Sequence, residues 1–327
     1  MKKAVLLIFI GAAFAGGGAV AAEEDVATIP AEYETGGGPA QAFGDGGMVA
    51  TGGLPAIRLN PAMMPLEPVY LMTLGWNWPE RGRPFYQAGI VDSRTSDIAA
   101  GVSFTGFTDA YNKFPDRDED GFDAPLEKRM VAAVAKAFRR ISIGVNGDYV
   151  VGYRQSGEGY RTVKGLAYGF GLAGLLTKRF RIGLSAENLG NRKIRDFAPE
   201  TWRAGVAWIA ADSNVTLHLD YRQRQRVPGF EQAKEQRSLT LTSGALLTGS
   251  LDDPEQMMIG SFSARVYGVI RLLGGYGYSL SDEERQSLSG GIGLIHNRFN
   301  LVWSGAKPWL RREQVRTSLT LSMLTSL

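Results

Sequence analysis

The stretch Val215-Thr216-Leu217-His218-Leu219-Asp220-Tyr221-Arg222 alternates strictly between apolar and polar side chains. Because successive side chains of a β-strand point to opposite faces, one face of this stretch is apolar and the other is polar. The segments 141–153, 180–187 and 315–323 show the same alternation. Such segments of about ten residues are typical of a transmembrane β-barrel, whose strands face lipid on one side and a wet lumen on the other. A water-soluble β-sandwich also alternates and stays as the alternative.

The turns between the segments indicate how many strands close the barrel. Fifteen segments resemble strands: 68–77, 84–92, 96–106, 128–138, 140–153, 163–177, 179–188, 200–210, 213–223, 237–247, 258–266, 268–279, 286–295, 297–306 and 314–325. Bacterial barrels have even strand numbers and short periplasmic turns. If 237–247 belongs to an outer loop at 224–257, every tight turn and both barrel ends are periplasmic. The sequence therefore predicts an all-β, transmembrane antiparallel β-barrel of about 14 strands, within a range of roughly 12–16.

In this arrangement the longer connections all face outward, where specificity usually resides. They lie near 77–83, 107–127, 154–162, 189–199, 224–257, 280–285 and 307–313. Aromatic residues gather at strand ends, and we interpret them as interfacial girdles, with ligand stacking as the alternative. They are Trp76, Trp78, Tyr86, Tyr153, Trp202, Trp208, Tyr221, Tyr278 and Trp303.

The N-terminus predicts export. Lys2 and Lys3, an apolar run and a small-residue end at 19–22 are typical of a secretory signal peptide at 1–22. No cysteine is present for a lipid anchor or a disulfide, and no later stretch has the roughly eighteen apolar residues of a spanning helix. Without the two signal lysines, 34 basic residues face 33 acidic ones, which argues against nucleic acid as a partner. We expect the outer membrane of a Gram-negative-type bacterium, with outer-membrane lipid around the barrel.

A glycine- and alanine-rich stretch at 42–62 precedes the first strand. It is too short to be a domain, and its small residues would let its backbone pack against a crowded inner wall. We therefore expect an N-terminal extension and hatch at 23–66, with the hatch in the lumen, followed by the barrel at 67–327.

The chain resembles the FadL/PorV-like outer-membrane superfamily. The resemblance rests on Asn60-Pro61-Ala62 before the first strand and on Glu187-Asn188-Leu189-Gly190-Asn191, and is supported by the stretches 272–276 and 288–294. It implies a fourteen-stranded barrel with an N-terminal hatch, whose residues here are Gly52, Gly53, Asn60, Pro61 and Ala62. For the transporter branch it implies a gated channel for a small hydrophobic or amphipathic cargo. The alternative is a PorV-like, non-transporting structural or adaptor barrel whose loop 224–257 binds another cell-envelope or secreted protein.

The predicted inner face is polar and charged. Opposite charges there either pair across the lumen and hold the hatch, or leave arginines ready for a carboxylate or phosphate head group. The predicted inner residues are Asn146, Asp148, Glu187, Arg203, His218, Asp220, Arg222, Arg265, Arg271, Asn300 and Arg316.

The second long connection carries a calcium-type pattern, D-x-D-x-D-G followed by five residues and Glu, at 116–127. Carboxylates of Asp116, Asp118 and Asp120, the Phe122 carbonyl and Glu127 would ligate Ca²⁺, with Gly121 at the turn. Pro125 and the neighbouring strands exclude an ordinary helix-flanked site, and a solvated acidic loop is the alternative. Possible Ca²⁺ is the one cofactor that the sequence suggests.

The sequence does not predict an enzyme. Only two histidines are present, and His296 lies in a predicted tight turn. His218 and Asp220 share the inner face, but no adjacent serine nucleophile can be identified. The chain has no cysteine, so it has no thiol nucleophile or thiolate metal ligand.

Overall fold

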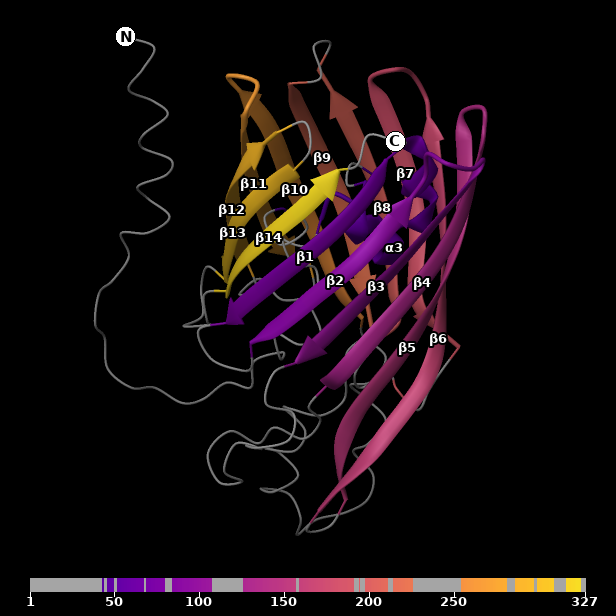
Figure 1. The fold of residues 1–327 in the computed structure, drawn as a ribbon. Coiled ribbons are helices and arrows are strands. Elements are labelled where there is room, and N and C mark those ends of the chain that lie inside the picture. The colour runs from indigo at the N-terminus through magenta and orange to yellow at the C-terminus, as the bar shows by residue number, and fades with distance from the viewer. Residues whose placement is uncertain are drawn as a thin grey trace, which may run out of the picture.

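The chain forms a closed barrel of fourteen antiparallel strands in a computed structural model (Figure 1). The structure describes residues 43, 46–49, 52–67, 69–79, 84–107, 126–156, 159–190, 194, 198–210, 214–225, 254–280, 286–296, 299–308 and 316–324. The strands are β1 (Tyr70–Pro79), β2 (Phe85–Asp92), β3 (Ile98–Phe107), β4 (Leu126–Phe138), β5 (Ile141–Ser156), β6 (Gly159–Leu175), β7 (Phe180–Leu189), β8 (Thr201–Ile209), β9 (Val215–Arg224), β10 (Glu255–Val266), β11 (Ile270–Ser279), β12 (Gln286–Ile295), β13 (Phe299–Pro308) and β14 (Arg316–Leu324).

Each strand pairs with its neighbours in sequence, and β1 pairs with β14 to close the barrel. The predicted fourteen-stranded barrel is confirmed. The segment 237–247, which the sequence assigns to an outer loop, lies outside the described residues.

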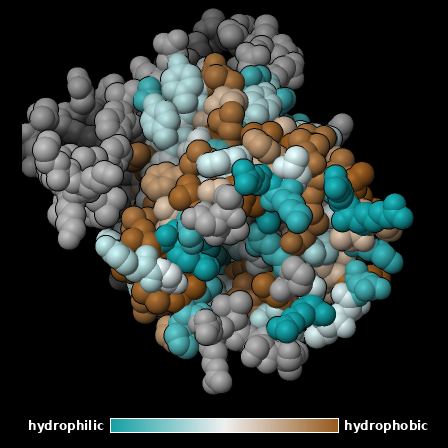
Figure 2. All heavy atoms as spheres, turned by 90° about the horizontal axis from the view of Figure 1, so that it is seen from above, coloured by the Kyte–Doolittle hydropathy of each residue, from teal (hydrophilic) through white to brown (hydrophobic). Residues whose placement is uncertain are grey.

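The tight turns lie together at one end of the barrel. The connections β2–β3, β4–β5, β6–β7 and β10–β11 each span only a few residues. Because the strands alternate in direction, these turns share an end with the start of β1 and the end of β14, which is the upper end in Figure 1. The predicted tight-turn end is thereby confirmed, whereas the predicted long-loop end also carries a short connection, between β5 and β6. Hydrophilic side chains are spread around the tight-turn end (Figure 2).

One predicted loop is wrong. The sequence places an outer loop at 154–162, but β5 continues to Ser156 and β6 begins at Gly159, with these two residues paired. The hairpin β5–β6 therefore reaches beyond the other strands at the long-loop end (Figure 1). The polar residues there interrupt the alternation, yet backbone pairing between the strands does not depend on side-chain polarity.

The outer surface of the barrel is apolar. On β9, Leu217 and Leu219 are each 47% exposed, whereas His218 and Asp220 between them are buried. The other strands repeat this pattern, as expected for a barrel surrounded by lipid. Exposed aromatic residues lie on the same outer face, where Trp76 stacks on Tyr86 with ring centroids 6.2 Å apart. Among the described residues, no helix is long and apolar enough to cross a membrane.

Candidate functional site

A short helical segment lies inside the barrel. Residues 43, 46–49 and 52–67, here called the lumen segment, include the helix α3 (Leu54–Leu59) and the 3₁₀-helix η2 (Pro61–Leu66). Helix α3 contacts β2, β3, β4 and β7, and η2 contacts β3 to β6. The side chains of the segment that are at most 1% exposed are Phe43, Met48, Val49, Ala56, Ile57, Leu59, Asn60, Ala62, Met63 and Met64. The segment thus fills much of the lumen toward the tight-turn end.

The local sequence explains the shape of the segment. Gly53 precedes α3 with φ 73°, a conformation that glycine adopts without steric cost. Asn60 ends α3 in an extended conformation and caps η2, because its side chain accepts a hydrogen bond from the Ala62 amide at 3.2 Å. Pro61 follows as the first residue of η2, where its missing N–H is not needed. Of the predicted hatch residues, Asn60, Pro61 and Ala62 therefore make the junction between α3 and η2, whereas Gly52 and Gly53 precede α3.

Three inward-facing glycines, here called the glycine floor, lie directly against the lumen segment around this junction. They are Gly144 on β5, Gly171 on β6 and Gly183 on β7. A Cβ on Gly144 would lie 2.7 Å from both the Ala62 nitrogen and the Pro61 carbonyl carbon. A Cβ on Gly171 would overlap the Asn60 side chain, and one on Gly183 would overlap Val49. Only hydrogen at these positions allows the segment to approach the wall so closely.

Polar groups of the wall also hold the segment. The Asn146 side-chain amide donates to the Ile57 carbonyl at 2.9 Å, at the C-terminal end of α3. Arg181 Nη1 lies 2.7 Å from Glu67 Oε1, where the segment leaves the lumen. Arg58 Nε lies 3.7 Å from Glu187 Oε2. The Asn146 contact satisfies a carbonyl near the C-terminal end of α3, and the two ion pairs hold the charged side chains of the segment against the wall.

The first part of the segment is fastened to β9. The Gly47 amide donates a short hydrogen bond to the Asp220 carboxylate. Gly205 makes room for that carboxylate, because a Cβ there would overlap it. The Phe43 ring lies 5.2 Å from the His218 ring, between their centroids. Neither ring nitrogen of His218 has a hydrogen-bond partner within the described part of the chain.

Nearer the long-loop end, the inner wall is crossed by buried ion pairs. Arg129 Nε donates to both carboxylate oxygens of Asp148, at 3.0 and 2.8 Å, and its Nη2 donates to Asn188 at 2.8 Å. Arg203 Nε lies 2.6 Å from Glu187 Oε1. Arg224 and Arg222 lie 2.6 and 3.8 Å from the Glu255 carboxylate. Each of these side chains is at most 7% exposed, so the pairs hold their charges away from water.

The other predicted inner residues differ in how far they are buried. Arg271 faces inward and donates to Ser263 Oγ at 3.3 Å. Arg265 has the inward parity but is exposed, because it lies at the tight-turn end of β10. Asn300 is half-buried on β13. Arg316 begins β14, and its side chain is not among those described.

The calcium-type pattern falls largely outside the structure. Residues 116–125 lie outside the described residues, and Glu127 is on β4 with its side chain undescribed. Among the side chains that are described, no three from His, Asp and Glu are grouped closely enough to hold a metal ion. Calcium binding at 116–127 stays a prediction.

The sequence analysis did not single out several residues that shape this site. Arg58 and Arg129 supply ion-pair partners, and the glycine floor fits the segment to the wall. A signal for the floor is present in hindsight: Gly169 and Gly171 stand at alternate positions of β6, which places both on one face. Arg129 follows Glu127 and Lys128, so the local sequence does not mark it as buried, and its burial becomes evident only with its partner Asp148 in view.

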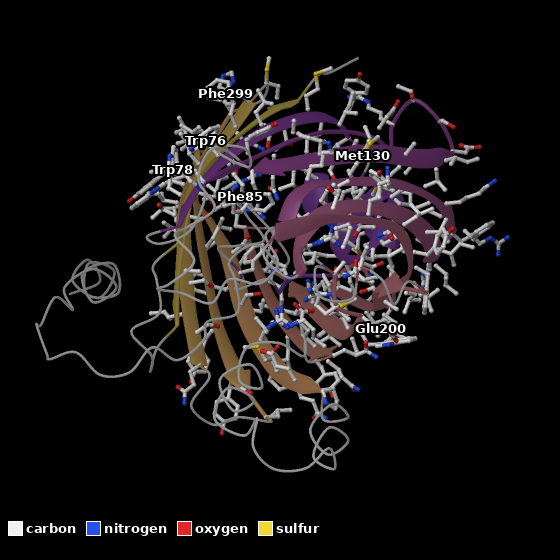
Figure 3. All side chains as sticks on the ribbon, turned by 90° about the horizontal axis from the view of Figure 1, so that it is seen from below. Trp76, Trp78, Phe85, Met130, Glu200 and Phe299 are labelled. Atoms are coloured by element: carbon white, nitrogen blue, oxygen red, sulfur yellow. The ribbon has the colours of Figure 1, made fainter. Side chains whose placement is uncertain are left out.

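An apolar cluster occupies the lumen toward the long loops. Phe85 and Phe107 pack with ring centroids 5.2 Å apart and join Val150, Ala167, Ile194 and Ala198. Figure 3 shows Phe85 inside the ring of strands, whereas Trp76, Trp78 and Phe299 lie on its outer side. The lumen therefore contains apolar surface as well as ion pairs.

Comparison with known proteins identifies solved structures that share this barrel fold. No protein-family model matches the chain, and no curated protein matches it either. Among solved structures, the toluene transporter TbuX of Ralstonia pickettii is 15% identical with a TM-score of 0.62, over 90% of this chain and 99% of that chain. The CymD monoaromatic hydrocarbon channel is 14% identical with a TM-score of 0.64, over 89% of this chain and 98% of that chain. A Pseudomonas aeruginosa FadL homologue is 10% identical with a TM-score of 0.56, over 88% of this chain and 97% of that chain. At these identities the likeness establishes the fold, and the chain has the barrel fold of the FadL-type hydrocarbon channels.

Proposed function

We propose that the chain is a channel of the bacterial outer membrane for small hydrophobic or amphipathic molecules, and that the lumen segment is its hatch. The observation that carries the proposal is the buried lumen segment, which packs against the inner wall from β2 to β11. A barrel of this size has room for a channel or a plugged cavity. In this proposal the segment occupies that room, and it shifts before cargo passes.

The contents of the lumen support a hydrophobic cargo. The buried carboxylates Asp148, Glu187 and Glu255 near the long-loop end are paired with arginines, and the Phe85–Phe107 cluster adds apolar surface to the lumen. The solved channels with this fold include toluene transporters. An uncharged molecule can move along such a wall without separating the ion pairs. We propose no catalytic role for this channel.

The strength of the anchors suggests how the hatch moves. The junction at Asn60 sits in the glycine floor and is held by Asn146 and by the Glu67–Arg181 pair. The part at 46–49 is fastened by its hydrogen bond to Asp220. We propose that residues 43–49 leave the wall first, while the junction stays seated.

Removing the hatch gives the first test. We expect a chain lacking residues 42–62 to conduct ions in planar bilayers, because its lumen would be open, whereas the intact chain conducts little. We also expect the intact chain to speed toluene uptake by a bacterial host whose outer membrane limits that uptake. Equal conductance and equal uptake for both chains would disprove the hatch. No acceleration of toluene uptake by the intact chain would disprove the channel.

The adaptor alternative depends on the loop 224–257. Within that range the structure describes only residues 224–225 and 254–257, so this function stays a prediction. It would be favoured by a protein that co-purifies with the intact chain in mild detergent and is lost when this loop is shortened.

A further inference from the structure

The inner wall divides into a charged sector and an uncharged sector. The inward-facing Asp, Glu, His and Arg side chains that the structure describes all lie on β4 to β11. The described inward-facing side chains of β12, β13, β14, β1, β2 and β3 carry no charge. Asn146, Arg181, Glu187 and Asp220, which bind the lumen segment, belong to the charged sector. Among the described side chains, the uncharged sector is thus the part of the wall where a cargo meets hydrogen-bonding groups without ion pairs; the side chain of Arg316, at the start of β14, is not among them.

Two buried polar side chains of the uncharged sector lack partners. Asn77 is 3% exposed and Thr320 is 5% exposed. Neither atom of the Asn77 amide, nor the Thr320 hydroxyl, has a hydrogen-bond partner within the described part of the chain. Buried polar groups are nearly always hydrogen-bonded, so such groups need an explanation. Neighbouring hydroxyls are paired, as Ser304 with Ser318 at 2.6 Å. In this sector the unpaired polar atoms belong to Asn77, to Thr320 and to the half-buried Asn300, whose Oδ1 also lacks a partner within the described part of the chain.

The strand register brings these two residues close together. In the β1–β14 ladder Gly75 lies opposite Thr320, and Asn77 lies opposite Ser318. The Thr320 hydroxyl is 3.3 Å from the position that a Cβ on Gly75 would take. Asn77 follows Gly75 by two residues on the same face of β1. The Thr320 hydroxyl and the Asn77 amide therefore lie on the same inner face, on either side of the Gly75 position.

Aromatic side chains lie next to Asn77. Phe85 lies opposite Asn77 in the β1–β2 ladder and packs on Phe107. Phe85 and Phe107 are 4% and 7% exposed, and Phe85 lies inside the ring of strands in Figure 3. An amide and a hydroxyl beside two aromatic rings match a small molecule with an apolar ring and one uncharged hydroxyl group.

We propose that Asn77 and Thr320 bind an uncharged, hydroxyl-bearing aromatic molecule of the phenol class, with its ring against Phe85. The proposal rests on the channel function proposed above and names its cargo class. The Asn77 amide can both donate to and accept from one hydroxyl group, and Thr320 adds a second partner. A carboxylate would find no described cation in this sector, and a plain hydrocarbon would leave the polar atoms unpaired.

Equilibrium binding of three probes tests the proposal. We expect the purified full-length chain in mild detergent to bind p-cresol more tightly than toluene, and to bind benzoate weakly. The variants Asn77→Leu and Thr320→Val should each weaken p-cresol binding about three- to tenfold, the range for one lost hydrogen bond. Neither should weaken toluene binding, and both should strengthen it, because they remove polar atoms that toluene leaves unpaired. Thr317→Val is the matched control, because Thr317 lies on the same strand with its hydroxyl on the Trp78 carbonyl, at the exposed face.

The outcomes separate the site from the channel function. Unchanged p-cresol affinity in both variants, or an equal loss of toluene affinity, would overturn the site while toluene uptake by the intact chain still supported the channel. If the intact chain does not transport toluene, the channel function fails, and the p-cresol affinities still decide the site. Heat-modifiable migration of each variant on a gel verifies that its barrel is folded, and the two variants test the site independently.

Discussion

Replacing Gly144 with valine is expected to displace the lumen segment and raise the ion conductance of the barrel several-fold. The added Cβ would lie 2.7 Å from backbone atoms of Pro61 and Ala62, and 2.9 Å from the Ala135 Cβ. Backbone atoms cannot rotate away as a flexible side chain can, so the segment itself must move. Overpacking of this kind costs about 1–3 kcal/mol, enough to shift a seated segment to a largely unseated one.

Gly147 on the same strand offers a matched control. Its added Cβ would come no closer than 3.9 Å, to Leu166, and its parity turns it toward the outer face. Valine favours strands, so neither substitution opposes the backbone conformation. Conductance in planar bilayers, measured for both variants, should rise for Gly144→Val alone. Equal conductance of the two variants would show that the glycine floor does not seat the segment.

Replacing Asp148 with asparagine is expected to lower the stability of the barrel by about 3–5 kcal/mol. Arg129 is fully buried on the inner wall, and Asp148 is the carboxylate that receives its guanidinium. Removing one partner of a buried pair leaves the other charge without compensation. Denaturant unfolding of the protein reconstituted in vesicles measures this loss.

The double variant Arg129→Met with Asp148→Leu separates the cost of the orphaned charge from the value of the pair. Replacing both ions with apolar side chains of similar size is often neutral or stabilising, so we expect most of the stability to return. A double variant as unstable as Asp148→Asn would instead indicate that the pair itself, or its link to Asn188, stabilises the wall.

Much of the fold follows from short-range patterns in the sequence. The alternation around Leu217 and Leu219 fixes which side chains face lipid, because the side-chain period of a strand is two. The lengths of the connections indicate the strand number and both barrel ends, since the tight turns lie at one end, with that between β5 and β6 as an exception. The prediction of a loop at 154–162 was wrong, because β5 and β6 stay paired there although the alternation of side chains stops.

The partners within the lumen could not be predicted in the same way. Gly47 and Asp220 are 173 residues apart in sequence, and no local pattern joins them. The inner face of Glu187 was predictable, but its pairing with Arg203 and Arg58 depends on the register of strands and on the seated lumen segment. The glycine floor was hidden because glycines are frequent throughout the chain, with 42 in total.

The central claim is that the lumen segment must leave the wall for cargo to pass, and a reversible cross-link tests it most directly. The chain has no cysteine, so Val49→Cys with Gly183→Cys introduces a single possible disulfide between the segment and β7. The atom that a Cβ on Gly183 would overlap is Val49 Cγ1. Replacing Val49 with cysteine in the same chain removes that methyl group, and the two sulfur atoms are then within reach of each other.

The measurement is the rate of toluene uptake by cells that carry this double variant, before and after reduction, with each single-cysteine variant as a control. We predict that uptake is lost while the disulfide is intact and returns on reduction, whereas the single variants do not respond. Equal uptake by the oxidised and reduced double variant, with the disulfide verified by mass spectrometry, would contradict the account.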